Sequence, residues 1–462
     1  MNHPTKELSL FPLITISITA VLSLSSISYM ATIGLQSIFF FVLAAVMFFV
    51  PSALVSAELG AMLTEDNGGI YTWVSNAFGK NTGLVAIWME WFNNVICFPS
   101  GLAALVATFA YVGFPALATE PYTMFTLMLV TLWGISLFNC LPIGKVAILN
   151  IIGATLGMIL PGSLLIICGI YWLIFGNVQI HMTSIHDIIP SFSFVTFALF
   201  VKVLSSYSGI QAVSFHARNI INPKKNIPLS MIIALLVIFL LTTLATVSLA
   251  SIVPASELSV FNGLIQGISV VLNKFHLHLL AQIITVCICV GLISMTSTWI
   301  LGPARAVQEV ATRGQAPQFM AKINKHGMPV NVLLIQAIIA SILATSFIIL
   351  PTIEQAFAMI IALTSQFTVV MWVMVFVSAI KLRYSAKHLE RPFRVGKRGN
   401  LAMIIWSSSG IIACGGGFFL GLFPPKFSHV TNISSYVTLM IIADVIIITI
   451  PFLYLIFRQN KN

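Results

Sequence analysis

Polar side chains interrupt two apolar stretches of the chain, residues 10–33 and 193–218. The candidate binding residues are Ser23, Ser25, Ser26 and Ser28 in the first stretch and Tyr207, Ser208, Gly209 and Gln211 in the second, together with Ser294 and Met295 from the later apolar stretch at 279–302. A helix that unwinds in a bilayer leaves backbone groups without partners, which is tolerated only where they face a cavity. Free amides that begin one half-helix attract a carboxylate, and free carbonyls that end the other attract an ammonium. An amino acid carries both groups and is the predicted ligand.

The same serines have a second interpretation, in which they serve only helix packing. A serine hydroxyl in a transmembrane helix often bonds to the preceding turn and lets two helices approach closely. Either stretch alone is compatible with this interpretation. The two stretches are, however, the first and sixth apolar segments of the chain, which correspond to each other in a five-plus-five inverted repeat. Their pairing favours a binding site between two discontinuous helices.

The elements around these residues are predicted to be membrane helices. Of the 462 residues, 58% are hydrophobic and 7% are charged, too few charges to cover a soluble domain. About twelve apolar stretches are each roughly 20 residues long, enough to cross a bilayer. Their approximate bounds are 10–33, 37–60, 83–111, 122–141, 146–175, 193–218, 229–253, 279–302, 330–350, 356–380, 401–423 and 435–457.

We therefore predict an all-α integral membrane protein with a single polytopic transmembrane domain at 1–457. Its inverted repeats span about 8–175 and 193–380, and two extra helices at about 401–457 precede a short cytoplasmic tail at 458–462. The first segment is interpreted as a retained helix, because no small-residue cleavage site with a mature domain follows it.

The net charge of +10 is explained by membrane orientation and not by a nucleic-acid partner. Nearly all Lys and Arg residues fall in alternate loops between the predicted spans, and only Lys274 and Lys426 fall in the others. Positive loops stay on the cytoplasmic side. The sequence thus predicts a multi-pass protein of the plasma membrane with both termini in the cytoplasm and the lipid bilayer as its surroundings.

Four ionisable side chains lie within predicted spans, where a charge costs about 2.5–3.5 kcal/mol at the bilayer centre. They are Glu58, Glu90, Lys202 and Asp444. Glu58 ends the second span, and we expect it to bond an inner-loop backbone group or a basic residue. Asp444 lies in the last span, outside the ten-helix core, and is interpreted as a packing charge.

Glu90, Lys202 and Glu58 are the candidates for coupling or gating. Lys202 precedes Ser208 by less than two helical turns. In one interpretation its stem extends outward until the ammonium reaches interfacial water. In the other it stands in the outer vestibule, where it attracts a carboxylate-bearing substrate or pairs with Glu90.

Three segments resemble the glutamate/GABA antiporter family of the amino acid–polyamine–organocation (APC) superfamily. They are VPSALVSAELGAMLTEDNGGIYTWVSNAFG (50–79), YSGIQAVSFHARNIINPKKNIPLSM (207–231) and STWILGPARAVQEVATRGQAPQFMAKINKHGMPV (297–330). The resemblance implies twelve helices, a five-plus-five inverted-repeat core of the LeuT-like type with discontinuous helices 1 and 6, and alternating access. It also implies exchange of one amino acid, or its decarboxylation product, for another across the bacterial inner membrane.

The chain departs from this family at several positions. The glutamate-exchanging members are expected to have acidic residues at the positions of Met295 and Gln211. They are also expected to have a tyrosine near the first break, where this chain has serines. The long cytoplasmic tail of acid-resistance members has no counterpart. The resemblance therefore transfers fold and general activity, but not glutamate/GABA specificity or acid gating. The less negative site is expected to accept anionic or zwitterionic amino acids more readily than cationic ones.

Other functions are less consistent with the sequence. An enzyme would need clustered nucleophiles or metal-ligand spacing, and a channel would need charge rings or a carbonyl filter. We predict no enzyme activity, cofactor or metal site, and the oligomeric state is not indicated. Among carriers, exchange ranks first, followed by proton symport through Glu90 and by sodium symport. The hydroxyls for sodium would come from the eighth span: Ser294, Thr296, Ser297 and Thr298.

Overall fold

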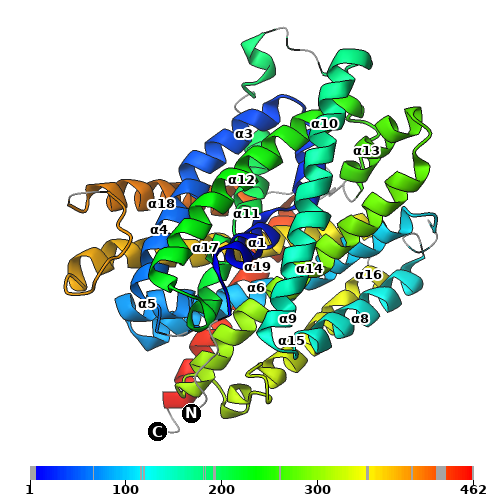
Figure 1. Ribbon diagram of the computed structural model, residues 1–462. Helices are drawn as coiled ribbons and strands as arrows, with labels where there is room; N and C mark the ends of the chain where they lie inside the picture. The colour runs from blue at the N-terminus through cyan, green and yellow to red at the C-terminus, as the bar shows by residue number, and fades with distance from the viewer. Residues whose placement is uncertain are drawn as a thin grey trace.

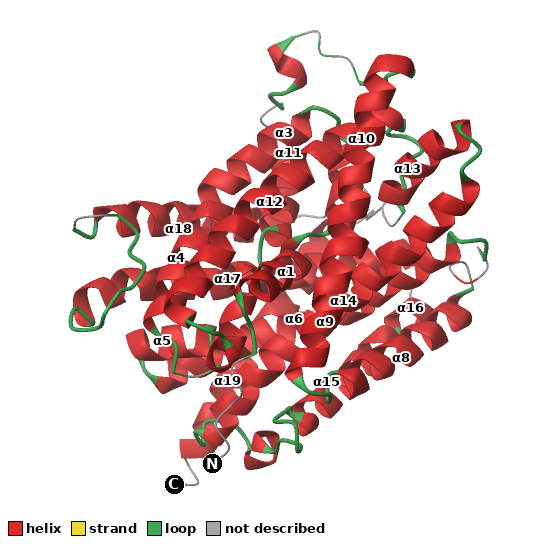
Figure 2. Ribbon diagram, viewed as in Figure 1, coloured by secondary structure: helices red, strands yellow, loops and turns green. Residues whose placement is uncertain are grey.

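The structure is a computed structural model of the whole chain. It describes residues 7–65, 67–114, 117, 120–180, 182, 184–190, 194–259, 262–349, 353–396, 399–422 and 433–459. Throughout these ranges the regular elements are helices, as Figure 2 shows, with a single isolated bridge between Leu8 and Ile220. The all-helical architecture agrees with the prediction.

Ten helical segments among the described residues are long and apolar enough to cross a membrane. They are α3–η1–α4 (Gln36–Met62), α6 (Lys80–Ala110), α8 (Pro121–Phe138), α9–η2–α10 (Ile143–Phe175), α12 (Pro223–Ile252), α14 (His278–Thr312), α15–α16 (Val330–Ile349), α17 (Ile353–Ser385), α18 (Leu401–Gly421) and α19 (Ile433–Gln459). Each overlaps one predicted span, and the helices extend beyond several of the predicted ends. Two shorter helices, α5 (Ile70–Phe78) and α13 (Gly263–Lys274), were not among the predicted spans because neither is long enough to cross.

The first predicted span is a bent pair of helices. Helix α1 (Leu10–Val21) and helix α2 (Leu24–Ala31) meet at an angle of 45°. Leu22 and Ser23 have extended backbones, and Ser23 is the N-cap of α2, its hydroxyl accepting from the Ser26 amide at 3.3 Å. A serine N-cap stabilises a new helix start, so the serine that suggested an interruption also begins the second half.

The sixth predicted span is also broken. Helix α11 (Phe194–Ser206) ends before a turn, and a 3-10 helix, η4 (Ile210–Asn219), follows it. Gly209 has φ +132°, a backbone conformation that L side chains rarely adopt. Both pieces are too short to cross a membrane alone. This span is therefore absent from the ten above, and its break lies at the glycine that the sequence indicated.

The two broken spans lie at the centre of the bundle. Helix α1 is near the middle of Figure 1 and packs against α12, α9 and η4. Helix α6 packs against α14, α17 and α5, so the long continuous helices surround the broken ones. This arrangement encloses the backbone interruptions in protein, as a bilayer requires. The repeat boundaries stay a prediction.

Candidate functional site

A cavity of about 210 Å³ lies between the two helix breaks. Seven predicted residues line it: Ser23, Ser25, Ser26, Ser208, Met295, Glu90 and Lys202. The cavity extends along α6 as far as Thr108 and reaches Asn262 ahead of α13. It is thus built from segments that are far apart in the chain and meet only in the fold.

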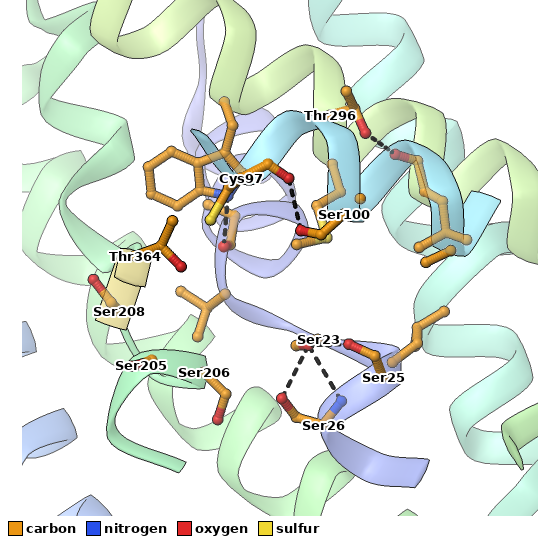
Figure 3. A pocket seen from close by; sticks show the side chains of 18 of the residues that line it. Ser23, Ser25, Ser26, Cys97, Ser100, Ser205, Ser206, Ser208, Thr296 and Thr364 are labelled. Carbon is orange, nitrogen blue, oxygen red and sulfur yellow. Dashed lines mark hydrogen bonds between the residues drawn. The ribbon is translucent and has the colours of Figure 1, made fainter. Parts of the chain in front are cut away.

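Hydroxyl groups from the two broken spans face each other across this cavity (Figure 3). Ser205 and Ser206 lie on the α11 side, opposite the serines that begin α2. The Ser26 hydroxyl donates to Ser23 Oγ at 3.0 Å, and Ser25 Oγ lies 3.2 Å from the same atom. These short side chains leave room for a ligand while offering both donors and acceptors.

Two opposite charges line the cavity on different helices. Glu90, on α6, is 2% exposed. Lys202, on α11, lines the same cavity, and among the described residues no ion pair within 4.0 Å joins it to Glu90. In the described part of the chain the Lys202 ammonium has neither a carboxylate nor a hydrogen-bond partner. A cation held this way in a membrane protein typically faces a substrate path.

Two further polar atoms in the cavity wall are buried and unpaired among the described residues. They are Asn93 Oδ1 and Ser205 Oγ. Leaving a buried polar atom without a partner costs about 1–3 kcal/mol. Together with the Lys202 ammonium they provide an acceptor, a hydroxyl and a cation for a polar ligand.

Gln211 connects the carboxylate of Glu90 to the break in the sixth span. Its side-chain amide donates from Nε2 to Glu90 Oε1 at 2.9 Å, and its Oε1 accepts from the Gly209 amide at 3.0 Å. Gln211 is completely buried and does not line the cavity. Gln211 therefore does not contact the cavity itself but holds Glu90 in position relative to the turn at Gly209.

Three predicted substrate contacts lie away from the cavity. Ser28 faces α13, where a Cβ on Gly263 would lie 2.8 Å from the serine Cβ. The ring of Tyr207 stacks on Phe49 with centroids 4.4 Å apart. Ser294 donates to Asn150 Oδ1 at 2.9 Å. None of these three side chains lines the cavity, because one turn of helix places successive residues on different faces.

The eighth-span hydroxyls proposed for sodium do not converge either. Thr298 donates to the same Asn150 oxygen at 3.0 Å, and Ser297 donates to Asn139 Oδ1 at 2.9 Å. Of the four, only Thr296 lines the cavity, and its hydroxyl donates to the Leu292 carbonyl at 2.8 Å. Three of the four hydroxyls therefore form hydrogen bonds to neighbouring helices, as polar residues in membrane helices often do.

Sequence reasoning missed several lining residues. They are Asn93, Cys97, Ser205, Ser206, Trp299 and Thr364 among others. Trp299 donates from Nε1 to the Ala20 carbonyl at 3.0 Å and so occupies a backbone acceptor that α1 leaves free at its end. Some of them could have been predicted from the sequence of α6. The spacing of Glu90, Asn93, Asn94 and Cys97 places these polar side chains on one face of a helix.

Glu58 lies outside the cavity, in the kind of contact that the sequence analysis expected. Its Oε2 accepts from Arg383 at 2.5 Å and from the Val395 amide at 2.7 Å, and its Oε1 lies 3.3 Å from Arg391 Nε. These contacts join the second span to the last turn of α17, through Arg383, and to the loop between α17 and α18. The carboxylate is a buried structural anchor.

Beyond the breaks, a buried arginine joins η4 to α14. Arg305 Nη1 lies 2.8 Å from His216 Nδ1, and its Nη2 donates to Asn219 Oδ1 at 2.6 Å. The Asn219 carbonyl in turn accepts from the amides of Glu7 and Leu8 at 3.1 and 3.0 Å. The chain ahead of α1 and the end of η4 are thereby held together.

A second arginine strengthens the same contact. Arg218 donates from both Nη atoms to Glu309 at 3.1 and 3.2 Å, and from Nε to the Glu65 carbonyl at 3.0 Å. Bidentate pairs of this kind are directional as well as strong. These contacts join the last turn of η4 to α14 and to the segment that follows α4.

A cavity between two helix breaks, enclosed by long continuous helices, is the arrangement of a membrane carrier. The chain matches the crystal structure of MhsT in complex with L-phenylalanine with a TM-score of 0.61 and 13% identity, over 90% of this chain and 99% of that one. The predicted LeuT-like fold class is confirmed.

The sequence then establishes the family. Residues 8–448 match the amino acid permease family, and the chain belongs to it. An uncharacterized transporter, lpg1691, of Legionella pneumophila subsp. pneumophila is 33% identical over 98% of this chain and 97% of its own. A glutamate/gamma-aminobutyrate antiporter of Lactococcus lactis subsp. cremoris is 30% identical over 99% of this chain and 92% of its own. The predicted resemblance to glutamate/GABA antiporters of the APC superfamily is confirmed.

Proposed function

We propose that this amino acid permease is an exchanger that binds one amino acid at a time in the cavity between the two helix breaks. The observation that carries the proposal is the joint presence, in one cavity, of serines from both breaks, a carboxyl group and a cation that has no partner among the described residues. A zwitterion matches such a set, because its carboxylate and ammonium satisfy groups that would otherwise stay buried without partners.

The proposed cycle is alternating access. With both termini cytoplasmic, as the distribution of basic residues predicts, the Arg305 and Arg218 contacts close the cytoplasmic side and the cavity faces outward. Inward opening then requires η4 to part from α14. The similarity to glutamate/gamma-aminobutyrate antiporters supports exchange over symport.

Counterflow tests this proposal. Purified protein in liposomes is loaded with each of the twenty amino acids, γ-aminobutyrate or a common amine, and labelled amino acid is added outside. We expect uptake only when a particular amino acid is present inside, which names the exchanged pair. Uptake into empty liposomes that follows an imposed proton or sodium gradient would instead establish a symporter.

Replacing Lys202 by methionine is expected to weaken uptake of acidic amino acids selectively. A hydrogen bond between an ammonium and a carboxylate contributes about 1.5–3 kcal/mol, so the KM for an acidic substrate should rise roughly ten- to hundredfold. The KM for a neutral substrate should change much less. Concentration-dependent uptake of L-glutamate and L-glutamine measures both.

Lys274→Met is the matched control. Lys274 also lies on a helix, with its Nζ 3.9 Å from the centroid of the Trp172 ring, but it does not line the cavity. It should leave the ratio of the two KM values unchanged. Equal effects of Lys202→Met on both substrates would show that its ammonium does not select for acidic side chains.

A further inference from the structure

Glu90 is the one carboxyl group among the described residues that line the cavity, and it has a single hydrogen-bond donor. That donor is Gln211 Nε2, at 2.9 Å. Within the described chain no cation lies within 4.0 Å of the carboxyl oxygens. The group is thus buried, lines the ligand space and has no counter-charge within 4.0 Å among the described residues.

The other titratable groups that face this space are few. Among the described lining residues they are Lys202 from α11 and Cys97, which lies on α6 with Glu90. The remaining walls contribute no titratable group: α1 and α2 provide serines and apolar residues, α14 provides Met295, Thr296 and Trp299, and the described part of α17 provides hydroxyls. The protonation state of Glu90 is therefore set by burial, by Gln211, by the charge of Lys202 and by whatever occupies the cavity.

An ionised carboxylate in this position is expensive when the cavity is empty. One amide donor does not replace the hydration that burial removes, and a buried charge without a partner takes up or loses a proton instead. Protonation also permits the Gln211 contact to remain, because Nε2 can donate to a carboxylate oxygen or, more weakly, to the carbonyl oxygen of a carboxylic acid. Gln211 thus positions the group in either state.

We propose that Glu90 is a proton-binding site which is occupied in the empty cavity and is emptied when the cationic group of a substrate binds beside it. The step balances simply: the Glu90 O–H bond breaks, the proton leaves to water through the cavity mouth, and the resulting carboxylate pairs with the substrate ammonium. One proton is released for each ammonium-bearing substrate bound. The proposal rests on the proposed function, because it takes the amino acid to occupy this cavity.

The consequence for transport is specific. In strict exchange, each substrate that binds releases a proton to the side from which it came. Each substrate that leaves is replaced on Glu90 by a proton from the side to which it goes. A full cycle therefore moves no net proton. Acidity on one side still weakens binding on that side, because proton and substrate compete for the same oxygen atoms. Over the range in which empty Glu90 is protonated, the apparent Kd should rise up to about tenfold for each unit by which the pH falls.

The test is proton release on binding. Protein in nanodiscs, held in a weakly buffered solution with a pH indicator, is titrated with L-glutamine, L-glutamate, γ-aminobutyrate and glutarate. We expect about one proton released per bound molecule for the three amino acids, and none for glutarate, which has carboxylates but no ammonium. Glu90→Gln should abolish the release and make the apparent Kd of the amino acids independent of pH, whereas Glu257→Gln, at an exposed loop position, should do neither.

Each other result overturns the proposal in a recognisable way. Amino acids that bind without proton release, and with the same Kd at pH 5 and pH 8, would exclude Glu90 as a proton site and leave the exchanger assignment intact. Release that persists in Glu90→Gln would place the proton elsewhere. Absence of any amino acid binding or counterflow in the native protein would overturn the proposed function together with this inference.

Discussion

Replacing Gly209 by alanine is expected to abolish most exchange activity. Gly209 has φ +132°, which strains any residue with a side chain, typically by about 1–3 kcal/mol. An added Cβ would also lie 2.7 Å from the Ala20 carbonyl oxygen and 2.9 Å from the Trp299 ring. The methyl group would therefore push apart the two broken spans at the point where they touch.

The displaced groups are those that shape the site. Ala20 and Trp299 line the cavity, and the Gly209 amide donates to Gln211, which holds Glu90. We expect initial rates of counterflow to fall roughly tenfold or more, in line with a loss of a few kcal/mol. The helical content measured by circular dichroism should stay nearly constant, because the change affects one turn.

Gly101→Ala is the matched control for this substitution. Gly101 itself lines the cavity, but it lies within helix α6 and an added Cβ would meet no atom within 4 Å. Alanine there is favoured by helix propensity, so counterflow should stay close to that of the native protein. If Gly209→Ala exchanged substrate as fast as Gly101→Ala, the break of the sixth span would not need the backbone conformation seen here.

Replacing Glu58 by glutamine is expected to destabilise the whole fold. The substitution removes the negative charge between Arg383, whose side chain is 2% exposed, and Arg391. Burial lowers the pKa of Arg391, and the charge of Glu58 opposes that shift. Without the carboxylate, two guanidinium groups face each other in a poorly hydrated space, and breaking a buried pair by removing one partner costs about 3–5 kcal/mol.

Thermal unfolding in detergent measures the effect, and an exposed ion pair provides the comparison. Lys224 and Glu390 are paired at 2.5 Å with side chains 56% and 73% exposed, so Glu390→Gln should cost only about 0–1 kcal/mol. A clear drop in Tm for Glu58→Gln and almost none for Glu390→Gln is the expected outcome. Equal melting of the two variants would mean that the loop between α17 and α18 does not depend on its buried anchor.

The sequence alone determined the class of fold and the places where two helices break. Apolar runs of membrane-spanning length predict helices because a bilayer requires every backbone group to be bonded within its own segment. Ser23 and Gly209 could be recognised as interruptions for local reasons, one as a helix N-cap and the other as a residue with unusual backbone freedom. The contact of Glu58 with a basic residue was also predictable, because a buried carboxylate needs one.

Only the tertiary structure decided which side chains meet in the site. Gln211 reaches Glu90 from another span, and Arg383 reaches Glu58 from the far half of the chain. Ser28 and Ser294 resembled binding residues by type but face neighbouring helices. The physical reason is that spacing along one helix predicts which residues share a face, whereas the rotation and packing of that helix against its neighbours depend on contacts distributed over the entire bundle.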